Sequence, residues 1–176
     1  MLSYCYVKML DTTNEYIIRR GFESEDEIVA DNYYNLWLDM GTRPEDMEDN
    51  WKETVIYRIK ENRRDLKLCT IVIVNDSQEI VGSAVCQIHS SELLHPDIMK
   101  RSVYQAGYLW GVFINPECRN KGLGKKMIKA CTEYFKEIGC HEAKLWASNK
   151  GKPVYRHEGY TLFDDDCVQE MVLKIK

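Results

Sequence analysis

The chain has 176 residues, a length that suits a single folded domain, and no stretch rich in proline, glycine or serine divides it. Hydrophobic residues make up 44% of the sequence and charged residues 30%, which excludes disordered, collagenous and membrane-embedded proteins. The net charge of -4 lacks the basic excess of a nucleic-acid-binding protein, so we expect no nucleic-acid partner.

The first part of the chain predicts one strand followed by two helices. A β-favouring run occupies residues 16–20. Ser24-x-x-Glu27 has the pattern of a capping box and precedes apolar residues at helical spacing, while Gly41 suits the position just beyond the helix end. A second motif, Thr42-x-x-Glu45, predicts the start of a second helix.

The middle of the chain predicts a hairpin and a further strand. Residues 68–74 and 79–88 are β-favouring runs separated by the turn-forming residues Asn-Asp-Ser. The polar stretch at residues 90–102 predicts a loop that borders the substrate. Residues 104–114 form the next strand, in which simple alternation places Tyr108, Trp110, Val112 and Ile114 on one face.

The last third predicts an amphipathic helix, with apolar residues at spacings of three or four, from about Gly122 to Gly139. A strand at residues 142–147, a short helix at 153–158 and two β-like pieces, around Thr161 and at 168–175, follow. Interleaved helices and strands with a central hairpin predict a mixed α/β sheet with helices on both faces. We expect residues 16–176 to form one domain, preceded by an extension of residues 1–15 that the sequence does not place.

The cysteines indicate whether a metal site is expected, and the first residues of the chain indicate the cellular location. The seven cysteines include no C-x-x-C pair, which argues against a disulfide framework and a zinc site, so we expect reduced thiols and no metal. The opening residues lack the charged start and apolar run of a signal peptide, and no apolar stretch reaches the length of a membrane span. We therefore expect a cytoplasmic protein that does not associate with membranes.

The segment with the clearest chemistry passes from a strand, through Pro116 and a glycine-containing turn, into the amphipathic helix. Unpaired N–H groups at a helix N-terminus bind anions, and Gly122 and Gly124 let a phosphate approach the backbone. A dinucleotide-binding G-x-G-x-x-G is excluded because Met127 replaces the third glycine, and a P-loop is excluded because Gly124 is followed by two lysines. The turn therefore predicts a different kind of phosphate site.

The motif Arg119-x-x-Gly122-x-Gly124 resembles the Q/R-x-x-G-x-G/A motif of GNAT acetyltransferases. Farther along, residues 145–160, with Tyr155 near the end of a short helix, resemble the family's strand and helix ending in L-Y-x-x-x-G-F. The resemblance implies the GNAT acyl-CoA N-acyltransferase fold, with a mostly antiparallel mixed sheet. It also implies an enzyme that moves the acetyl group of acetyl-CoA to a primary amine, by direct attack in a ternary complex.

Site residues follow from the same resemblance. One strand edge pairs with the pantetheine arm of acetyl-CoA, the turn holds the pyrophosphate, and an asparagine after the next strand also contacts the cofactor. Since Ser148 occupies the position of that asparagine, the choice between Ser148 and its neighbour Asn149 stays open. The implied cofactor-binding residues are Val112, Phe113, Ile114, Arg119, Asn120, Lys121, Gly122, Leu123, Gly124, Lys125 and Asn149.

The reaction needs a base for the amine, an oxyanion donor and a proton donor for the CoA thiolate. The resemblance makes Tyr155 the catalytic proton donor, and a backbone N–H of Phe113 or Ile114 would polarise the oxyanion. No base is named, because the strand at 104–114 has no acidic residue and the carboxylates of the first two helices are not ranked.

The acceptor and the state of the protein stay open at this stage. The acceptor is a small molecule or a peptide amine, and the chain acts as a monomer or as a homodimer. Aromatic residues of the first two helices suit either the core or a pocket, and we take them as core: Tyr33, Tyr34, Trp37 and Trp51. The main alternative function is a catalytically silent CoA-binding regulatory module.

Overall fold

The computed structural model describes residues 9–13, 15–90, 100 and 105–162. In this part of the chain six strands form a single sheet in the order β1-β2-β3-β4-β5-β6. The first five strands pair antiparallel with their neighbours, and β6 pairs parallel with β5, which confirms the mixed, mostly antiparallel sheet. The strands are β1 (Met9–Thr13), β2 (Tyr16–Arg20), β3 (Cys69–Asn75), β4 (Ile80–Ile88), β5 (Ala106–Ile114) and β6 (Glu142–Leu145).

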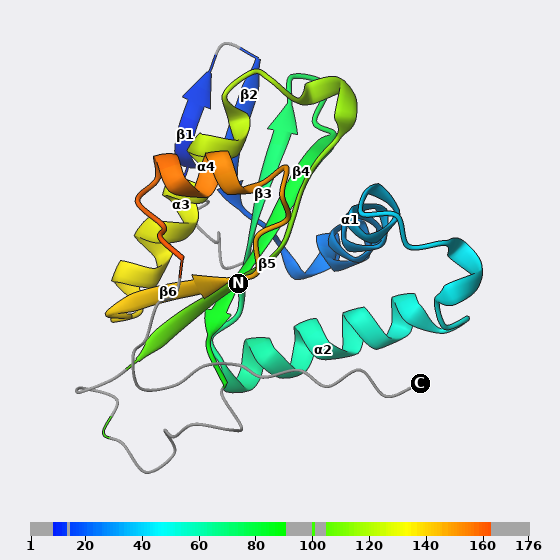
Figure 1. Ribbon diagram of the computed structural model, residues 1–176, viewed down its shortest axis with the longest axis horizontal. Helices are drawn as coiled ribbons and strands as arrows, with labels where there is room; N and C mark the ends of the chain where they lie inside the picture. Colours follow the sequence, from blue (N-terminus) through cyan, green and yellow to red (C-terminus); the bar gives the residue numbers. More distant parts are fainter. Residues whose placement is uncertain (1–8, 14, 91–99, 101–104, 163–176) are drawn as a thin grey trace, which may run out of the picture.

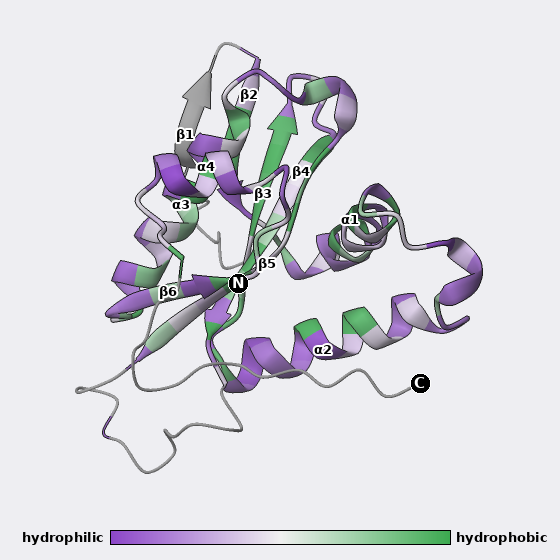
Figure 2. Ribbon diagram, viewed as in Figure 1, coloured by the Kyte–Doolittle hydropathy of each residue, from purple (hydrophilic) through white to green (hydrophobic). Residues whose placement is uncertain are grey.

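Helices cover both faces of the sheet, as predicted (Figure 1). On one face α1 (Asp26–Asp39) and α2 (Trp51–Asp65) contribute Val29 and Ile59 to a core shared with β3 and β4. On the other face α3 (Leu123–Glu137) and α4 (Lys152–His157) pack over a larger core. Figure 2 shows that β3 and β4, which lie between these two layers, are hydrophobic along most of their length. None of the helices in the described ranges has the length and apolar character that a membrane crossing requires.

The amphipathic helix predicted near residues 122–139 is confirmed as α3. Its buried residues follow the predicted spacing and include Leu123, Met127, Cys131 and Phe135. Gly139 follows the helix with φ of +83°, a left-handed conformation that glycine adopts without strain.

Both predicted starts of the first two helices are wrong. Before α1, Glu25 accepts a hydrogen bond from the Phe22 N–H at 2.7 Å, so the chain makes a 3-10 turn at Glu23–Glu25. The Ser24-x-x-Glu27 box is therefore not formed at the start of α1. The residues after Thr42 form a separate 3-10 turn, Pro44–Asp46, and α2 begins later, at Trp51.

The secondary structure near the two ends of the chain differs from the prediction. Part of the N-terminal segment that the sequence did not place forms β1, an edge strand paired with β2. After α4, residues 160–162 have no regular secondary structure. The predicted strand at 168–175 and nearly all of the predicted loop at 90–102 lie outside the described residues.

Candidate active site

The last part of β5 has no partner on the side of β6. The parallel pairing of the two strands ends with Leu109 opposite Leu145, where β6 stops. The fifth strand continues to Ile114, and its other edge stays paired with β4. Among the described residues, this leaves one edge of β5 unpaired next to the start of α3. Such an edge offers backbone donors and acceptors to an extended ligand.

A bulge interrupts β5 at the point where the edge becomes unpaired. Gly111 and Val112 together face the single residue Ala84, and Gly111 has φ of +61°. Because of the extra residue, Trp110 packs with the core under α1 and α2, whereas Val112 packs with the core under α3. The prediction that these two side chains share one face is therefore wrong.

Backbone pairing distinguishes the two predicted oxyanion donors. Asn115 donates to the Val81 carbonyl at 2.8 Å, and Phe113 lies directly opposite Ser83 of β4. In an antiparallel ladder alternate residues direct their N–H and C=O groups to the same neighbour, so Phe113 faces β4 and Ile114 faces away. The Ile114 carbonyl instead accepts a hydrogen bond from Arg119 Nε at 2.8 Å. Of the two amides, that of Ile114 is the one directed to the unpaired edge.

The glycine-containing turn presents free backbone donors at the start of α3. Lys126 makes the first backbone bond of the helix, to the Gly122 carbonyl at 3.4 Å, so the preceding N–H groups lie beyond the helical ladder. The N–H groups of Leu123, Gly124 and Lys125 have no acceptor within the described ranges. These groups, with the positive end of the helix dipole, make an anion site.

The two glycines of the turn serve it in different ways. Gly122 has φ of +75°, and a Cβ added to it would meet nothing within 4 Å, so its backbone conformation is what requires glycine. A Cβ on Gly124 would lie 3.6 Å from Val154 of α4 and 3.8 Å from Ile114. Gly124 thus marks the place where the turn, the end of β5 and α4 meet.

The basic side chains of the turn have separate partners. Arg119 forms an ion pair with Asp39 at the end of α1 and lies over the Phe113 ring, 5.6 Å from its centre. Lys121 donates to the Tyr16 hydroxyl at 2.8 Å. In the described part of the chain Lys125 makes no hydrogen bond or ion pair, so its ammonium group remains available to a bound anion.

The predicted proton donor lies on α4, in the layer that also carries the turn. The Tyr155 ring packs against Tyr160, with ring centres 5.9 Å apart, and joins the core under α3. Burial raises the pKa of Tyr155 to about 12. The phenol therefore keeps its proton at neutral pH, which is the state that a donor requires.

The two candidates for a cofactor contact after β6 are both exposed. The Ser148 hydroxyl accepts a hydrogen bond from the Gly151 N–H at 3.1 Å and so helps to start α4. The Asn149 side-chain oxygen accepts from Lys152 Nζ at 3.0 Å. Both side chains are engaged locally, so Asn149 stays the predicted contact and Ser148 its alternative.

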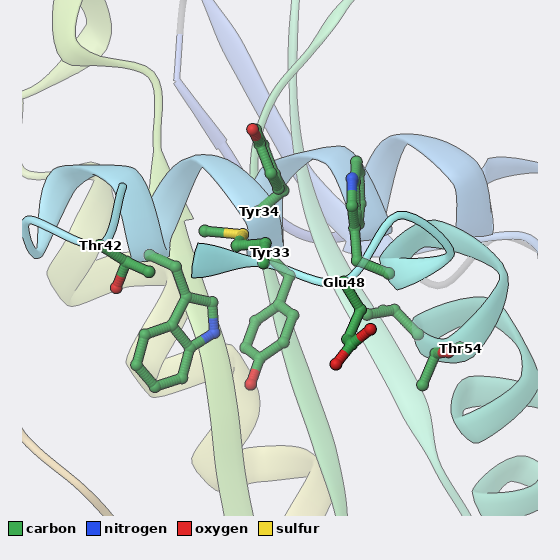
Figure 3. Close-up of a pocket in the computed structure, with 9 residues that line it drawn as sticks. Tyr33, Tyr34, Thr42, Glu48 and Thr54 are labelled. Atoms are coloured by element: carbon green, nitrogen blue, oxygen red, sulfur yellow. The ribbon is translucent and has the colours of Figure 1, made fainter. Parts of the chain in front are cut away.

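A groove lies on the opposite face of the sheet, between α1, the segment before α2 and α2 itself (Figure 3). Its volume is about 290 Å³. We call it the aromatic groove, and its lining residues are Tyr33, Tyr34, Trp37, Thr42, Met47, Glu48, Trp51, Thr54 and Val55.

The aromatic groove corrects the interpretation of four residues that were taken as core. Tyr33, Tyr34, Trp37 and Trp51 line it, and Trp37 is 40% exposed. Sequence periodicity did not separate the two possibilities, because a pocket between two helices uses the same inward faces as a core. The sequence did contain one signal for a pocket: Trp37 and Trp51 lie on either side of a connection that contains Pro44.

The groove reaches the bulge of β5 through Tyr33. The Tyr33 ring lies edge-on to Trp110, with ring centres 5.1 Å apart, and a Cβ added to Gly111 would lie 3.4 Å from it. A neighbouring hollow of about 360 Å³ shares Tyr33 with the groove and extends to Tyr108 and Trp110 of β5. Neither hollow includes the glycine turn, so the turn and the groove approach β5 from different sides of the sheet.

Of the two hollows, the aromatic groove is the one whose described lining includes a carboxylate. Glu48, in the segment before α2, lies in the aromatic groove, and no other acidic residue in the described ranges lines either hollow. Several carboxylates of α1 are engaged elsewhere: Asp26 is buried and held by Arg63 at 2.7 Å, and Asp31 pairs with Lys52 at 2.9 Å. Glu48 is thus singled out among the acidic residues that the sequence left unranked.

Known proteins share both this fold and parts of the sequence. A Clostridium acetobutylicum acetyltransferase structure with acetyl-CoA superimposes with a TM-score of 0.70 and 21% identity, covering 89% of this chain and 96% of that one. A GCN5-related N-acetyltransferase from Ralstonia eutropha JMP134 gives a TM-score of 0.70 and 18% identity, covering 91% of this chain and 98% of that one.

Sequence comparison agrees with the structural one. The mycothiol acetyltransferase of Arthrobacter sp. (strain FB24) is 28% identical over 101 residues, which are 56% of this chain and 29% of that protein. The chain therefore spans less than a third of the length of this curated relative. The model of the acetyltransferase (GNAT) family matches residues 30–160, which include both helical layers and the turn. On this match, the chain belongs to the GNAT acetyltransferase family.

Proposed function

We propose that this acetyltransferase uses acetyl-CoA and transfers the acetyl group to the nitrogen of a primary amine in a ternary complex. The observation that carries the proposal is the group of free N–H donors at Leu123, Gly124 and Lys125, which lies beside the unpaired edge of β5. A pyrophosphate fits the first feature, because its charge matches the helix N-terminus and Gly122 leaves the approach open. An extended pantetheine arm fits the second.

The residues of the turn and of β5 would divide the work of binding. The backbone of residues 119–125 and the Lys125 ammonium group would hold the pyrophosphate, while residues 112–114 would pair with the arm. The Arg119 side chain would act indirectly, since it supports the Ile114 carbonyl and is paired with Asp39. Asn149 would add a contact from the loop before α4.

The chemistry follows from what the two sides of β5 supply. Bound acetyl-CoA supplies an activated acetyl group in the form of a thioester. The neutral amine nitrogen attacks the carbonyl carbon, a C–N bond forms, the C–S bond breaks, and the amine proton passes to solvent or a carboxylate. The Ile114 N–H, directed to the unpaired edge, would stabilise the developing oxyanion.

Tyr155 would act at the departing sulfur. A phenol with a pKa of about 12 is a weak acid beside a thiol with a pKa of about 8.5, so complete proton transfer to the thiolate is unfavourable. A hydrogen bond from the phenol to the developing thiolate carries no such penalty and lowers the barrier while charge develops. We therefore assign Tyr155 as a hydrogen-bond donor to the leaving group, with solvent supplying the final proton.

The test is an assay of thiol release from acetyl-CoA with a panel of primary amines, together with calorimetric binding of CoA. Binding of CoA and amine-dependent thiol release with formation of the acetamide support the proposal. Binding without transfer to any amine of the panel favours the silent CoA-binding module. The absence of CoA binding overturns the proposed function.

A further inference from the structure

Four of the nine residues that line the aromatic groove are aromatic. The Tyr33 ring lies edge-on to Trp37, with ring centres 6.0 Å apart, and also edge-on to Trp110 at 5.1 Å. Tyr34 stacks on Trp51 with ring centres 4.4 Å apart and planes 20° from parallel. Rings packed in this way are held in place. Flat apolar groups pack on their faces and edges, and organic cations are attracted to their faces.

The charge of the groove comes from Glu48. Its backbone carbonyl accepts a hydrogen bond from the Trp51 N–H at 3.1 Å, which fixes the residue at the start of α2. In Figure 3 its carboxylate and the Tyr33 hydroxyl point toward the same side of the groove. Within the described ranges Glu48 forms no ion pair, whereas Glu45 nearby pairs with Arg43 at 3.4 Å. The groove therefore contains an available negative charge among aromatic rings.

Among the residues that the structure describes, no basic side chain lines the aromatic groove. Arg58 lines the neighbouring hollow instead. A phosphorylated or carboxylated ligand placed in the groove would meet the Glu48 carboxylate without a compensating cation, which is unfavourable. The volume of about 290 Å³ lies at the lower end of the range for ligand pockets, so the occupant is small.

Resting on the proposed function, we propose that the acetyl acceptor is a small primary amine whose nitrogen is carried on an aromatic or apolar body. Its ammonium group binds the Glu48 carboxylate, and its body packs among Tyr33, Trp37 and Trp51. The groove thereby selects such amines over phosphorylated amino sugars and over amino acids that carry acidic side chains. The same ammonium group must lose its proton before attack, so Glu48 serves recognition of the free acceptor.

The experiment measures amine binding by calorimetry in the presence of saturating CoA, which occupies the cofactor site without supplying an acetyl group. The probes are 2-phenylethylamine, its uncharged counterpart 2-phenylethanol, and glucosamine 6-phosphate. The variants are Glu48→Gln and, as a matched control, Glu45→Gln, an exposed carboxylate of the same connection outside the groove. Unfolding midpoints of both variants verify that each is folded.

We expect 2-phenylethylamine to bind on the order of fivefold more tightly than 2-phenylethanol, because a partly exposed ion pair and ring–cation contacts contribute modestly. Glu48→Gln should remove this preference, Glu45→Gln should retain it, and glucosamine 6-phosphate should bind more weakly than either. The inference is overturned by equal affinities of the two phenyl compounds, by a preference that survives Glu48→Gln, or by tighter binding of glucosamine 6-phosphate. Since CoA binding is measured first on the same samples, failure of the proposed function is recognised separately by the absence of CoA binding.

Discussion

Asp39, the last residue of α1, accepts a hydrogen bond from Arg119, the first residue of the glycine-turn motif. The pair joins the helix that carries Tyr33 and Trp37 to the segment proposed to hold the cofactor. Both side chains are more than a third exposed, so the ion pair itself should contribute less than about 1 kcal/mol to stability. The pair matters more for how the two proposed binding sites are connected than for the stability of the fold.

Substitutions of these two residues should therefore differ in their effect on CoA. Asp39→Asn removes a negative charge near the turn and leaves the bond from Arg119 to the Ile114 carbonyl, so CoA should bind at least as tightly as before. Arg119→Leu removes both interactions and should weaken binding. Calorimetric affinities for CoA test the contrast, and equal losses in the two variants would contradict it.

Acetyl-CoA should stabilise the folded chain. A ligand present at one hundred times its dissociation constant raises the free energy of unfolding by about 2.7 kcal/mol when it binds the native state alone. Thermal unfolding with and without acetyl-CoA measures the effect. Saturating acetyl-CoA without a change in the unfolding midpoint would falsify cofactor binding.

Gly122→Val should weaken CoA binding sharply. A branched side chain resists φ of +75° and occupies the open space from which a phosphate approaches the backbone. Gly139→Val is a matched control, because Gly139 has φ of +83° at the opposite end of α3. Both variants should lose stability, measured by chemical unfolding, and only Gly122→Val should lose CoA affinity. A folded Gly122→Val protein with unchanged affinity would exclude the turn as the phosphate site.

Tyr155→Phe should lower kcat more than it lowers affinity for acetyl-CoA. The substitution keeps the ring that packs against Tyr160 and removes the hydroxyl that would stabilise the departing sulfur. We expect a loss on the order of 10²-fold in kcat. The measurement uses saturating acetyl-CoA and an acceptor found in the amine panel. Equal turnover in the two proteins would leave Tyr155 with a packing role.

The same residue makes stability sensitive to alkaline pH. The usual pKa of a tyrosine is about 10, and burial raises that of Tyr155 to about 12, so below about pH 10 both folded and unfolded chains keep the proton. Between about pH 10 and 12 the unfolded chain loses it while the folded chain does not, and stability falls as pH rises. Tyr155→Phe should make this fall less steep in urea unfolding at pH 9 to 11. Burial also raises the pKa values of Tyr134 and Tyr160, so part of the fall should remain.

Local signals accounted for much of the fold and for the turn. The amphipathic pattern of α3 and the glycine at each of its ends are properties of adjacent residues, which is why the sequence predicted them. The pairing of β1 and the start of α2 at Trp51 depend on contacts or on competing turn geometry that periodicity does not report. Simple alternation also failed at Gly111, because a bulge depends on the register of the partner strand β4.

In the candidate site too, features with a local sequence signal were predicted and features that depend on distant contacts were not. The motif predicted an anion site in the turn, but the pairing of Arg119 with Asp39 joins residues far apart in the sequence and had no local signature. The aromatic groove was missed for a related reason, since Tyr33 and Trp51 have similar spacing whether a ligand or the core covers them.

The bulge at Gly111 and Val112 also determines where β5 can tolerate a change in length. Trp110 stays opposite Val85 and Phe113 stays opposite Ser83, because the extra residue is taken up within the bulge. Removing one of the two bulge residues would therefore restore uninterrupted pairing with β4 and leave the side chains on either side of it on their present faces. The same deletion in the regular part of β5 would turn one part of the strand over relative to β4, and would be far more damaging.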